Sequence, residues 1–161
     1  MSARSGIGYD SHRFAAGRPL RLGGVTIPHT HGLAGHSDGD AILHAITDAL
    51  LGAAALGDIG SFFPDTEPQW KGADSSLFVK GAVEALKGAG LAVYQVDVTV
   101  IAERPKLAPH VGAMRAATAK LLGVAMDAVS IKAKTNEGMG WIGRGEGIGV
   151  IAVATVRGAG G

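Results

Sequence analysis

The residues best suited to chemistry in this chain are an Asp-x-His pair, Asp10 and His12, and a third residue further along, His44. If residues 6–14 form a β-strand, side chains two positions apart point to one face, so Asp10 and His12 project together. His44 stands in an apolar stretch with helical periodicity, which opens on the polar run His36-Ser37-Asp38-Gly39-Asp40. Two imidazoles and one carboxylate suit zinc, and three protein ligands leave a fourth tetrahedral position for substrate or water. The pattern therefore predicts a catalytic zinc site.

The same residues fit a second interpretation, a capped helix without a metal. Ser37 or Asp38 would be the N-cap, and His44 would be a partly buried helical histidine bonded to Asp40 or Asp48. Since Asp40, His44 and Asp48 are spaced four apart on one helical stripe, a carboxylate could equally hold the imidazole of a metal-binding His44. Spacing alone does not decide between the two, because short motifs also occur by chance.

A second polar group ends a predicted strand at residues 129–135 and precedes a glycine-rich segment at residues 138–149. It consists of Lys132, Lys134, Thr135, Asn136 and Glu137, followed by Trp141, Arg144 and Glu146. Backbone amides in such a loop can meet phosphate, and a glutamate beside it suits a hard divalent ion shared with phosphate oxygens. A glycine-rich hairpin closed by an Arg144–Glu146 ion pair fits the same residues.

Two further segments carry weaker signals. Residues 57–66 are rich in turn formers yet contain Phe62 and Phe63, which favours an ordered surface loop; the alternative is a plain connection between helices. Residues 102–108 fit an ordinary strand-to-helix turn.

Composition limits the class of protein. The 161 residues suit a single domain, residues 1–161, with one core. A net charge of +1 with 18% charged residues lacks the basic field that nucleic-acid binding usually requires. There are no cysteines, which excludes disulfides and thiolate zinc. Because hydrophobic residues reach 47%, more than a lone domain of this size comfortably hides, we expect a homo-oligomer.

Neither a membrane span nor a targeting segment is expected. The apolar stretches at residues 41–56 and 147–156 are interrupted by polar residues or glycines and fall short of the roughly 20 residues that cross a bilayer. Residues 1–5 are too short for a targeting peptide. We therefore expect a soluble, intracellular protein, which in a bacterium means a cytoplasmic one.

Periodicity and turn residues predict strands and helices that share one core. Strands are expected at residues 6–14, 20–28, 92–102, 129–135 and 147–157, the first two joined as a hairpin through Gly17 and Pro19. Helices are expected at residues 40–56, 75–88 and 109–122, with Asp74 as the N-cap of the second. The order ββααβαββ predicts an α/β (α+β) fold in which helices cover one side of a mixed sheet.

Taken together, the motifs resemble those of the 2-C-methyl-D-erythritol 2,4-cyclodiphosphate synthase family in order and spacing. The matching runs are Gly8-Tyr9-Asp10-Ser11-His12, His36-Ser37-Asp38-Gly39-Asp40, Leu43-His44, Gly57-Asp58-Ile59-Gly60, Phe63-Pro64-Asp65-Thr66, Arg104-Pro105-Lys106, Lys134-Thr135-Asn136-Glu137 and Gly143-Arg144-Gly145-Glu146-Gly147. The resemblance spans residues 6–156, so it is far more specific than any single motif. Two positions differ from the usual family pattern: Lys134 replaces a common threonine and Gly138 a common lysine.

The resemblance implies a homotrimer with active sites between adjacent subunits. Each site would convert the 2-phosphate of 4-diphosphocytidyl-2-C-methyl-D-erythritol to the cyclic diphosphate plus CMP, in the non-mevalonate synthesis of isoprenoid precursors. Asp10, His12 and His44 would hold one Zn²⁺ per subunit, and Glu137 would hold Mg²⁺ or Mn²⁺ with the substrate diphosphate. Arg144 would face a central channel, where an isoprenoid diphosphate could sit.

The same resemblance implies which residues meet the cytidine diphosphate substrate. Residues 58–60 and 63–67 would hold the methylerythritol end and a nearby phosphate, and residues 102–108 of the neighbouring subunit would hold the cytosine. His36 and Thr135 would be catalytic, as hydrogen-bond donors to the phosphates. The full substrate-binding set is Asp10, Ser11, His12, His36, Ser37, Asp58, Ile59, Gly60, Phe63, Pro64, Asp65, Thr66, Glu67, Ala102, Glu103, Arg104, Pro105, Lys106, Leu107, Ala108, Lys134, Thr135, Asn136, Glu137, Trp141 and Arg144.

Two other functions fit these residues. A zinc phosphohydrolase would use the open metal position to activate water. A non-catalytic trimer would use the metal structurally and bind an isoprenoid at its apolar centre. Cyclisation would need neither a general base nor a nucleophilic serine, because the attacking group is already an anionic phosphate oxygen.

Overall fold

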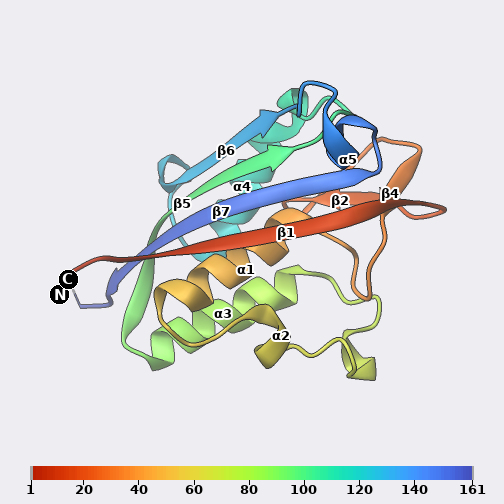
Figure 1. Ribbon diagram of the computed structural model, residues 1–161. Helices are drawn as coiled ribbons and strands as arrows, with labels where there is room; N and C mark the ends of the chain where they lie inside the picture. The colour runs from red at the N-terminus through yellow and green to blue at the C-terminus, as the bar shows by residue number, and fades with distance from the viewer. Residues whose placement is uncertain (1, 161) are drawn as a thin grey trace.

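A five-stranded mixed sheet carries the two longest strands of the protein, one from each end of the chain. The computed structural model describes residues 2–160 (Figure 1). The strand order is β4-β1-β7-β5-β6, in which β5 and β6 are parallel and the other neighbours antiparallel. The strands of this sheet are β1 (Arg4–Ala16), β4 (His31–Leu33), β5 (Leu91–Ile101), β6 (Val129–Lys134) and β7 (Gly147–Gly158).

Three long helices cover one face of this sheet, as Figure 1 shows. They are α1 (Ala41–Ala53), α3 (Ser76–Gly88) and α4 (Val111–Leu122). Short helical segments connect the larger elements: α2 (Ile59–Phe62), α5 (Gly140–Gly143), and the 3₁₀ turns Pro68–Trp70, Ala108–His110 and Met126–Ala128. Among residues 2–160, no helix combines the length and apolar character that crossing a membrane requires.

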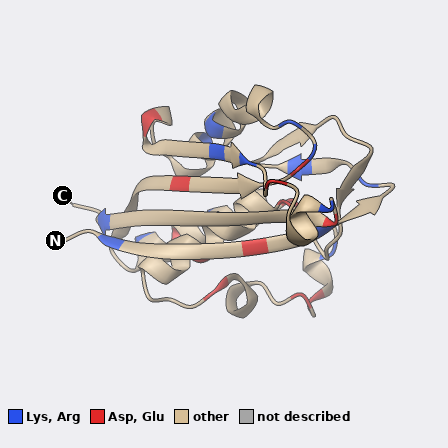
Figure 2. Cartoon of the chain, turned by 45° about the horizontal axis from the view of Figure 1, so that its top comes forward, with Lys and Arg blue, Asp and Glu red and all other residues tan. Residues whose placement is uncertain are grey.

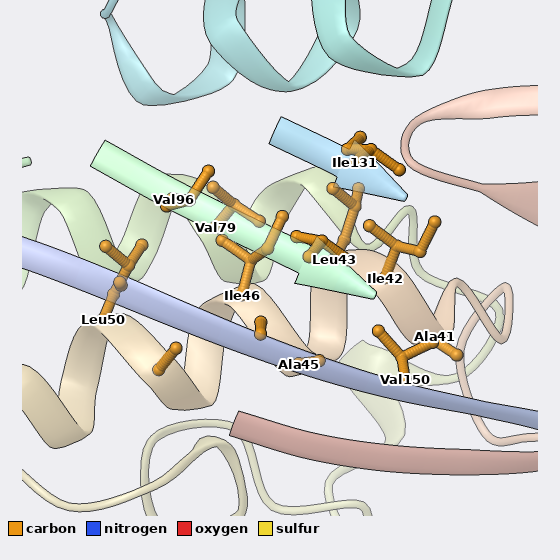
Figure 3. Close-up of a cluster of buried hydrophobic side chains, with 14 of the residues drawn as sticks. Ala41, Ile42, Leu43, Ala45, Ile46, Leu50, Val79, Val96, Ile131 and Val150 are labelled. Atoms are coloured by element: carbon orange, nitrogen blue, oxygen red, sulfur yellow. The ribbon is translucent and has the colours of Figure 1, made fainter. Parts of the chain in front are cut away.

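The core lies between the sheet and α1, which is apolar at nearly every position. Ile42 and Ile46 of α1 are fully buried and share one cluster with Val96 of β5 and Val150 of β7 (Figure 3). A helix that is apolar all round is buried on all sides, which is why α1 becomes the central helix. The side chains of α1 are therefore held in fixed positions against the sheet.

Helix α1 approaches β1 closely because β1 presents glycines to it. A Cβ atom on Gly8 would overlap the carbonyl oxygen of Ala45, and one on Gly6 would overlap the backbone of Ala49 and Ala53. The two backbones thus pack against each other with no side chain between them. This contact brings the next inward-facing residues of β1 beside the first turns of α1.

The prediction of one strand at residues 20–28 is wrong. The structure has two short strands there, β2 (Leu20–Leu22) and β3 (Val25–Ile27), which pair with each other. Gly23 and Gly24 both have positive φ, 61° and 78°, as a two-residue hairpin turn requires. As a result β1 pairs with β7 and β4, and the expected hairpin with residues 20–28 does not form.

The other predicted elements are present with ends that shift by a few residues. Helix α3 has Ser75 at its N-cap position and not Asp74, although the Asp74 carboxylate accepts the N–H of Ser76 at 2.9 Å. The predicted order ββααβαββ also leaves out three short elements of the structure, β4, α2 and α5. A mixed sheet with helices on one face agrees with the expectation.

Candidate metal centre and active site

Asp10 and His12 from β1 converge with His44 from α1. The Asp10 Oδ2 atom lies 2.8 Å from His12 Nδ1 and 3.5 Å from His44 Nδ1, and the two imidazole centroids are 5.2 Å apart. One ligand atom from each residue lies within 4.8 Å of the others. Ligands at 2.0–2.2 Å around one tetrahedral ion are about 3.4 Å apart, so small rotations suffice to close a zinc site.

The chemistry of these donors fits a divalent cation. Asp10 Oδ2 and His12 Nδ1 are both buried and, although near each other, neither has a hydrogen-bond partner of acceptable geometry. Burial opposes ionisation of Asp10, but its interactions with the His12 and His44 imidazoles outweigh burial and lower the pKa of this carboxyl. A carboxylate oxygen that faces two imidazoles without a well-formed hydrogen bond to either can serve with them as a ligand of a divalent cation.

The contacts of the neighbouring acids correct two predictions. Asp40 is the N-cap of α1, in place of Ser37 or Asp38: its carboxylate accepts the N–H of Leu43 at 3.1 Å. The same carboxylate accepts the N–H groups of the β2–β3 turn at 2.9 and 2.8 Å, which leaves it no contact with His44. The Asp48 carboxylate also binds backbone, because it accepts the N–H of Ile59 at 2.7 Å. Neither acid holds the imidazole.

Two serines contact His44 instead. Its Nε2 atom lies 2.8 Å from Ser75 Oγ and 3.1 Å from Ser37 Oγ. Both serines are buried. Ser75 stands 31 positions from His44 along the chain, so no local pattern could have indicated this contact.

A cavity of about 560 Å³ opens beside the three metal-ligand candidates. Its lining contains residues predicted for the metal site and residues predicted for substrate binding: Asp10, Ser11, His12, His36, Ser37, His44, Ile59, Gly60, Phe63, Pro64, Asp65 and Thr66. Asp58 and Glu67 flank this lining. Asp58 caps α2 by accepting the N–H of Ser61 at 2.8 Å, and the carbonyl oxygen of Glu67 lies 3.3 Å from His36 Nε2. The loop at residues 57–67 is therefore an ordered wall of the cavity.

Sequence reasoning missed three residues of this lining, Gly35, Trp70 and Phe78. Trp70 and Phe78 pack with Phe63, with ring centroids 4.9 to 5.6 Å apart. The His44 ring also lies 5.6 Å from Phe78. The cavity thus has an apolar, aromatic part beside its polar part. A tryptophan shortly after a turn-rich loop was the available signal.

The second group of predicted residues lies elsewhere in the protein, at the carboxyl ends of β5 and β6. Because these strands are parallel, their ends meet at one edge of the sheet, and Ala102 donates its N–H to Lys134 O at 2.9 Å. Glu103 accepts the N–H groups of Asn136 at 2.7 Å and Gly138 at 3.2 Å. Residues 102–108 and 134–137 therefore form one structural unit.

The chain does not bring this second unit to the metal centre. None of residues 102–108 or 134–137 lines the cavity beside His44. Trp141 lines a smaller hollow of about 270 Å³ together with Ser11 and His12. Arg144 pairs with Glu146 at 2.8 Å, as the ion-pair interpretation predicts.

Fold and site together define a class of protein: an α/β domain that presents one carboxylate and two imidazoles to an open cavity, as metal-dependent enzymes do. An aromatic wall and a polar loop complete the cavity. The chain belongs to the YgbB family, whose sequence pattern matches residues 3–157.

Named relatives cover nearly the whole chain. It is 60% identical over 153 residues to the 2-C-methyl-D-erythritol 2,4-cyclodiphosphate synthase of Gemmatimonas aurantiaca. The aligned residues make up 95% of this chain and 92% of that protein. The enzyme of the same name from Salinibacter ruber is 56% identical over 156 residues, 97% of this chain and 99% of that protein. A solved structure of such a synthase in its CDP-bound form matches with a TM-score of 0.88 at 40% identity, covering 96% of this chain and 100% of that chain.

Proposed function

We propose that this protein is a cyclodiphosphate synthase. It converts the 2-phosphate of 4-diphosphocytidyl-2-C-methyl-D-erythritol to 2-C-methyl-D-erythritol 2,4-cyclodiphosphate and CMP in isoprenoid precursor synthesis. The observation that carries the proposal is the convergence of Asp10, His12 and His44 on an open cavity in a chain that matches such synthases over almost its full length. Because a phosphorylated substrate does not cross a bilayer unaided, we also propose a cytoplasmic location.

Asp10, His12 and His44 would hold Zn²⁺, which when bound offsets negative charge on a phosphate in the open position. The attacking group is already an anionic phosphate oxygen, so the protein must mainly position it in line with the phosphorus that it attacks. His36, which lines the same cavity, would donate a hydrogen bond to charge that develops on phosphate. The aromatic side of the cavity would exclude water, which favours cyclisation over hydrolysis.

We assign the remaining roles to a second subunit. We propose a homotrimer in which residues 102–108 of one subunit hold the cytosine while the metal centre of its neighbour holds the methylerythritol phosphate. Thr135 would donate a hydrogen bond to a phosphate, and Glu137 would hold Mg²⁺ or Mn²⁺ with the diphosphate. The separation of the two units within one chain supports this arrangement, because each unit alone has only half of the required groups. The CDP-bound state of the matched synthase supports a cytidine nucleotide as ligand.

The outer face of the sheet offers a surface for such an assembly. Ile7 is 69% exposed and Tyr9 59%, and they are paired with Val153 and Ile151 on β7. The middle of β7 has no charged residue (Figure 2). Exposed apolar side chains in one patch mark an interaction surface. Arg144, near one end of this face, would meet an isoprenoid diphosphate in a central channel.

Turnover of the purified protein with substrate and Mg²⁺ tests the proposal. Phosphorus NMR should show a cyclic diphosphate, and CMP should appear in equal amount. In water enriched in ¹⁸O the product should carry no label; a labelled linear product would reject cyclisation and indicate a zinc phosphohydrolase. Turnover that persists at full rate after the metal is removed would reject both.

A pair of histidine variants makes the test specific to the site. His44→Ala should lose bound zinc and activity while the oligomer stays assembled, because the outer sheet face is intact. His29→Ala, which removes an imidazole outside the metal cavity, should keep its zinc. Unchanged zinc content in His44→Ala would remove His44 from the ligand set.

A further inference from the structure

We infer that Ser75, backed by Asp38, is the positioning residue of the metal centre: the pair fixes the tautomer and ring orientation of His44. The inference rests on the proposed metal site and goes beyond it by naming what makes His44 a competent ligand. The serine and the acid lie outside the residues that line the cavity. They would act through the imidazole and not on the substrate.

The two nitrogens of His44 face different partners. Nδ1 points towards Asp10, with 3.5 Å between Nδ1 and Oδ2, and Nε2 lies 2.8 Å from Ser75 Oγ. A neutral imidazole carries one proton, so the nitrogen that binds a metal must be the unprotonated one. Nδ1 can bind the metal only when the proton is on Nε2.

Asp38 sets the direction of the hydrogen bonds. Ser75 Oγ makes a short hydrogen bond to Asp38 Oδ1. An ionised carboxylate accepts hydrogen bonds and donates none, so the hydroxyl must donate its proton to Asp38. The Ser75 oxygen can then only accept from its other neighbours, which are His44 Nε2 at 2.8 Å and, further away, Ser37 Oγ at 3.5 Å. At 2.8 Å an unprotonated Nε2 would set two lone pairs against each other, so Nε2 must be the donor. The chain from Asp38 through Ser75 therefore selects the Nε2–H tautomer.

The carboxylate itself is held in place by the backbone. Asp38 Oδ2 accepts the N–H of Ser75 at 3.0 Å, and Oδ1 accepts the N–H of Asp40 at 3.0 Å. The Asp38 N–H donates to Ala73 O at 3.0 Å. Ser75 is completely buried, so water does not compete for its hydroxyl. Asp38 itself is partly exposed, but the Ser75 hydroxyl that faces His44 is fixed and shielded from water, as a group that orients a metal ligand must be.

Ser37 does not fulfil this role, although its hydroxyl is 3.1 Å from the same nitrogen. Ser37 Oγ accepts the N–H of Gly39 at 3.3 Å, and none of its contacts in residues 2–160 is with a carboxylate. Without an obligate acceptor behind it, a hydroxyl can donate to or accept from an imidazole. Without Ser75, the proton of the His44 imidazole should therefore no longer be confined to Nε2.

The affinity for Zn²⁺, measured by competition with a chelator in the absence of substrate, tests the inference. Loss of a partner behind a metal-binding histidine weakens affinity roughly 10–100-fold, and we expect this for Ser75→Ala. Ser76→Ala is the matched control, since it removes a hydroxyl one position away that does not contact His44, and its affinity should stay at the wild-type value. Ser75→Thr, which keeps the hydroxyl, should restore most of the affinity.

The tautomer is read directly by two-bond ¹H–¹⁵N correlation of the histidine side chains in the metal-free wild-type protein. His44 should carry its proton on Nε2. An Nε2 atom without a proton would overturn the inference, even if Ser75→Ala fails to fold. Equal zinc affinity in folded Ser75→Ala and wild type would overturn it as well. Failure of the wild type to bind zinc would instead reject the metal site, and with it the proposed function.

Discussion

Replacing Gly8 by alanine should separate the two elements that carry the metal ligands. Gly8 lies on β1, where its Cα faces the backbone of α1. An added Cβ would overlap the carbonyl oxygen of Ala45 and would lie 2.8 Å from Ala45 C and 2.9 Å from Ala49 N. These are backbone atoms, so no side-chain rotation can relieve the overlap, and α1 must move away from β1.

The cost follows from the burial of α1. Inserting a methyl group into a packed core costs about 1–3 kcal/mol, and the upper end applies where backbone must shift. We therefore expect Gly8→Ala to lose about 3 kcal/mol of unfolding free energy. For a domain of this size each 1 kcal/mol lowers Tm by about 2–4 °C, so Tm should fall by about 6–12 °C. Zinc affinity should fall too, because His44 moves with α1 while Asp10 and His12 stay on β1.

Thermal unfolding followed by circular dichroism, together with chelator competition for zinc, would measure both effects. Gly112→Ala is the control: it lies in α4, and no atom is near the position of its Cβ. Alanine there should raise stability by about 0.5–1 kcal/mol, since glycine is the poorer helix former. A Gly8→Ala protein with wild-type Tm and zinc affinity would refute the direct packing of α1 on β1.

Three more outcomes follow from single contacts. Asp40→Ala should lower the unfolding free energy by about 2–3 kcal/mol, because the buried N–H groups of Gly23 and Leu43 lose their acceptor. A loss of less than about 0.5 kcal/mol in a denaturant titration would contradict this prediction. Tyr9→Lys should shift the oligomer towards monomer in analytical ultracentrifugation, and an unchanged mass would exclude the outer sheet face as the interface. Glu103→Gln should weaken CMP binding, measured by calorimetry, without changing the zinc content, because the Glu103 carboxylate holds the backbone of residues 136–138 in place. A loss of zinc in this variant would contradict the separation of the two units.

Sequence alone located the parts of the site that depend on local spacing. Asp10 and His12 share a face because strand geometry fixes i and i+2 residues, and His44 follows from helical periodicity. The glycines at positions 6 and 8 could not be recognised as the contact that brings these elements together. Their role depends on which helix packs on β1, and local periodicity does not encode that choice.

Long-range polar contacts could not be predicted from the sequence for the same reason. The sequence offered Asp40 and Asp48 as partners of His44, because both lie four positions away, yet backbone N–H groups occupy both carboxylates. The nearer of the two serines that contact His44, Ser75, comes from the start of a different helix. The Gly23-Gly24 pair is a typical two-residue hairpin turn, but the apolar residues on both sides of it led to the prediction of one continuous strand.

Anomalous diffraction at the zinc edge, on crystals grown with zinc and CMP, tests the central claim most directly. We expect one strong peak per subunit, about 2.0–2.2 Å from the Asp10 carboxylate and from one nitrogen each of His12 and His44, with the fourth position free of protein atoms. A peak away from these side chains, a fourth protein ligand, or no peak at all would contradict the account.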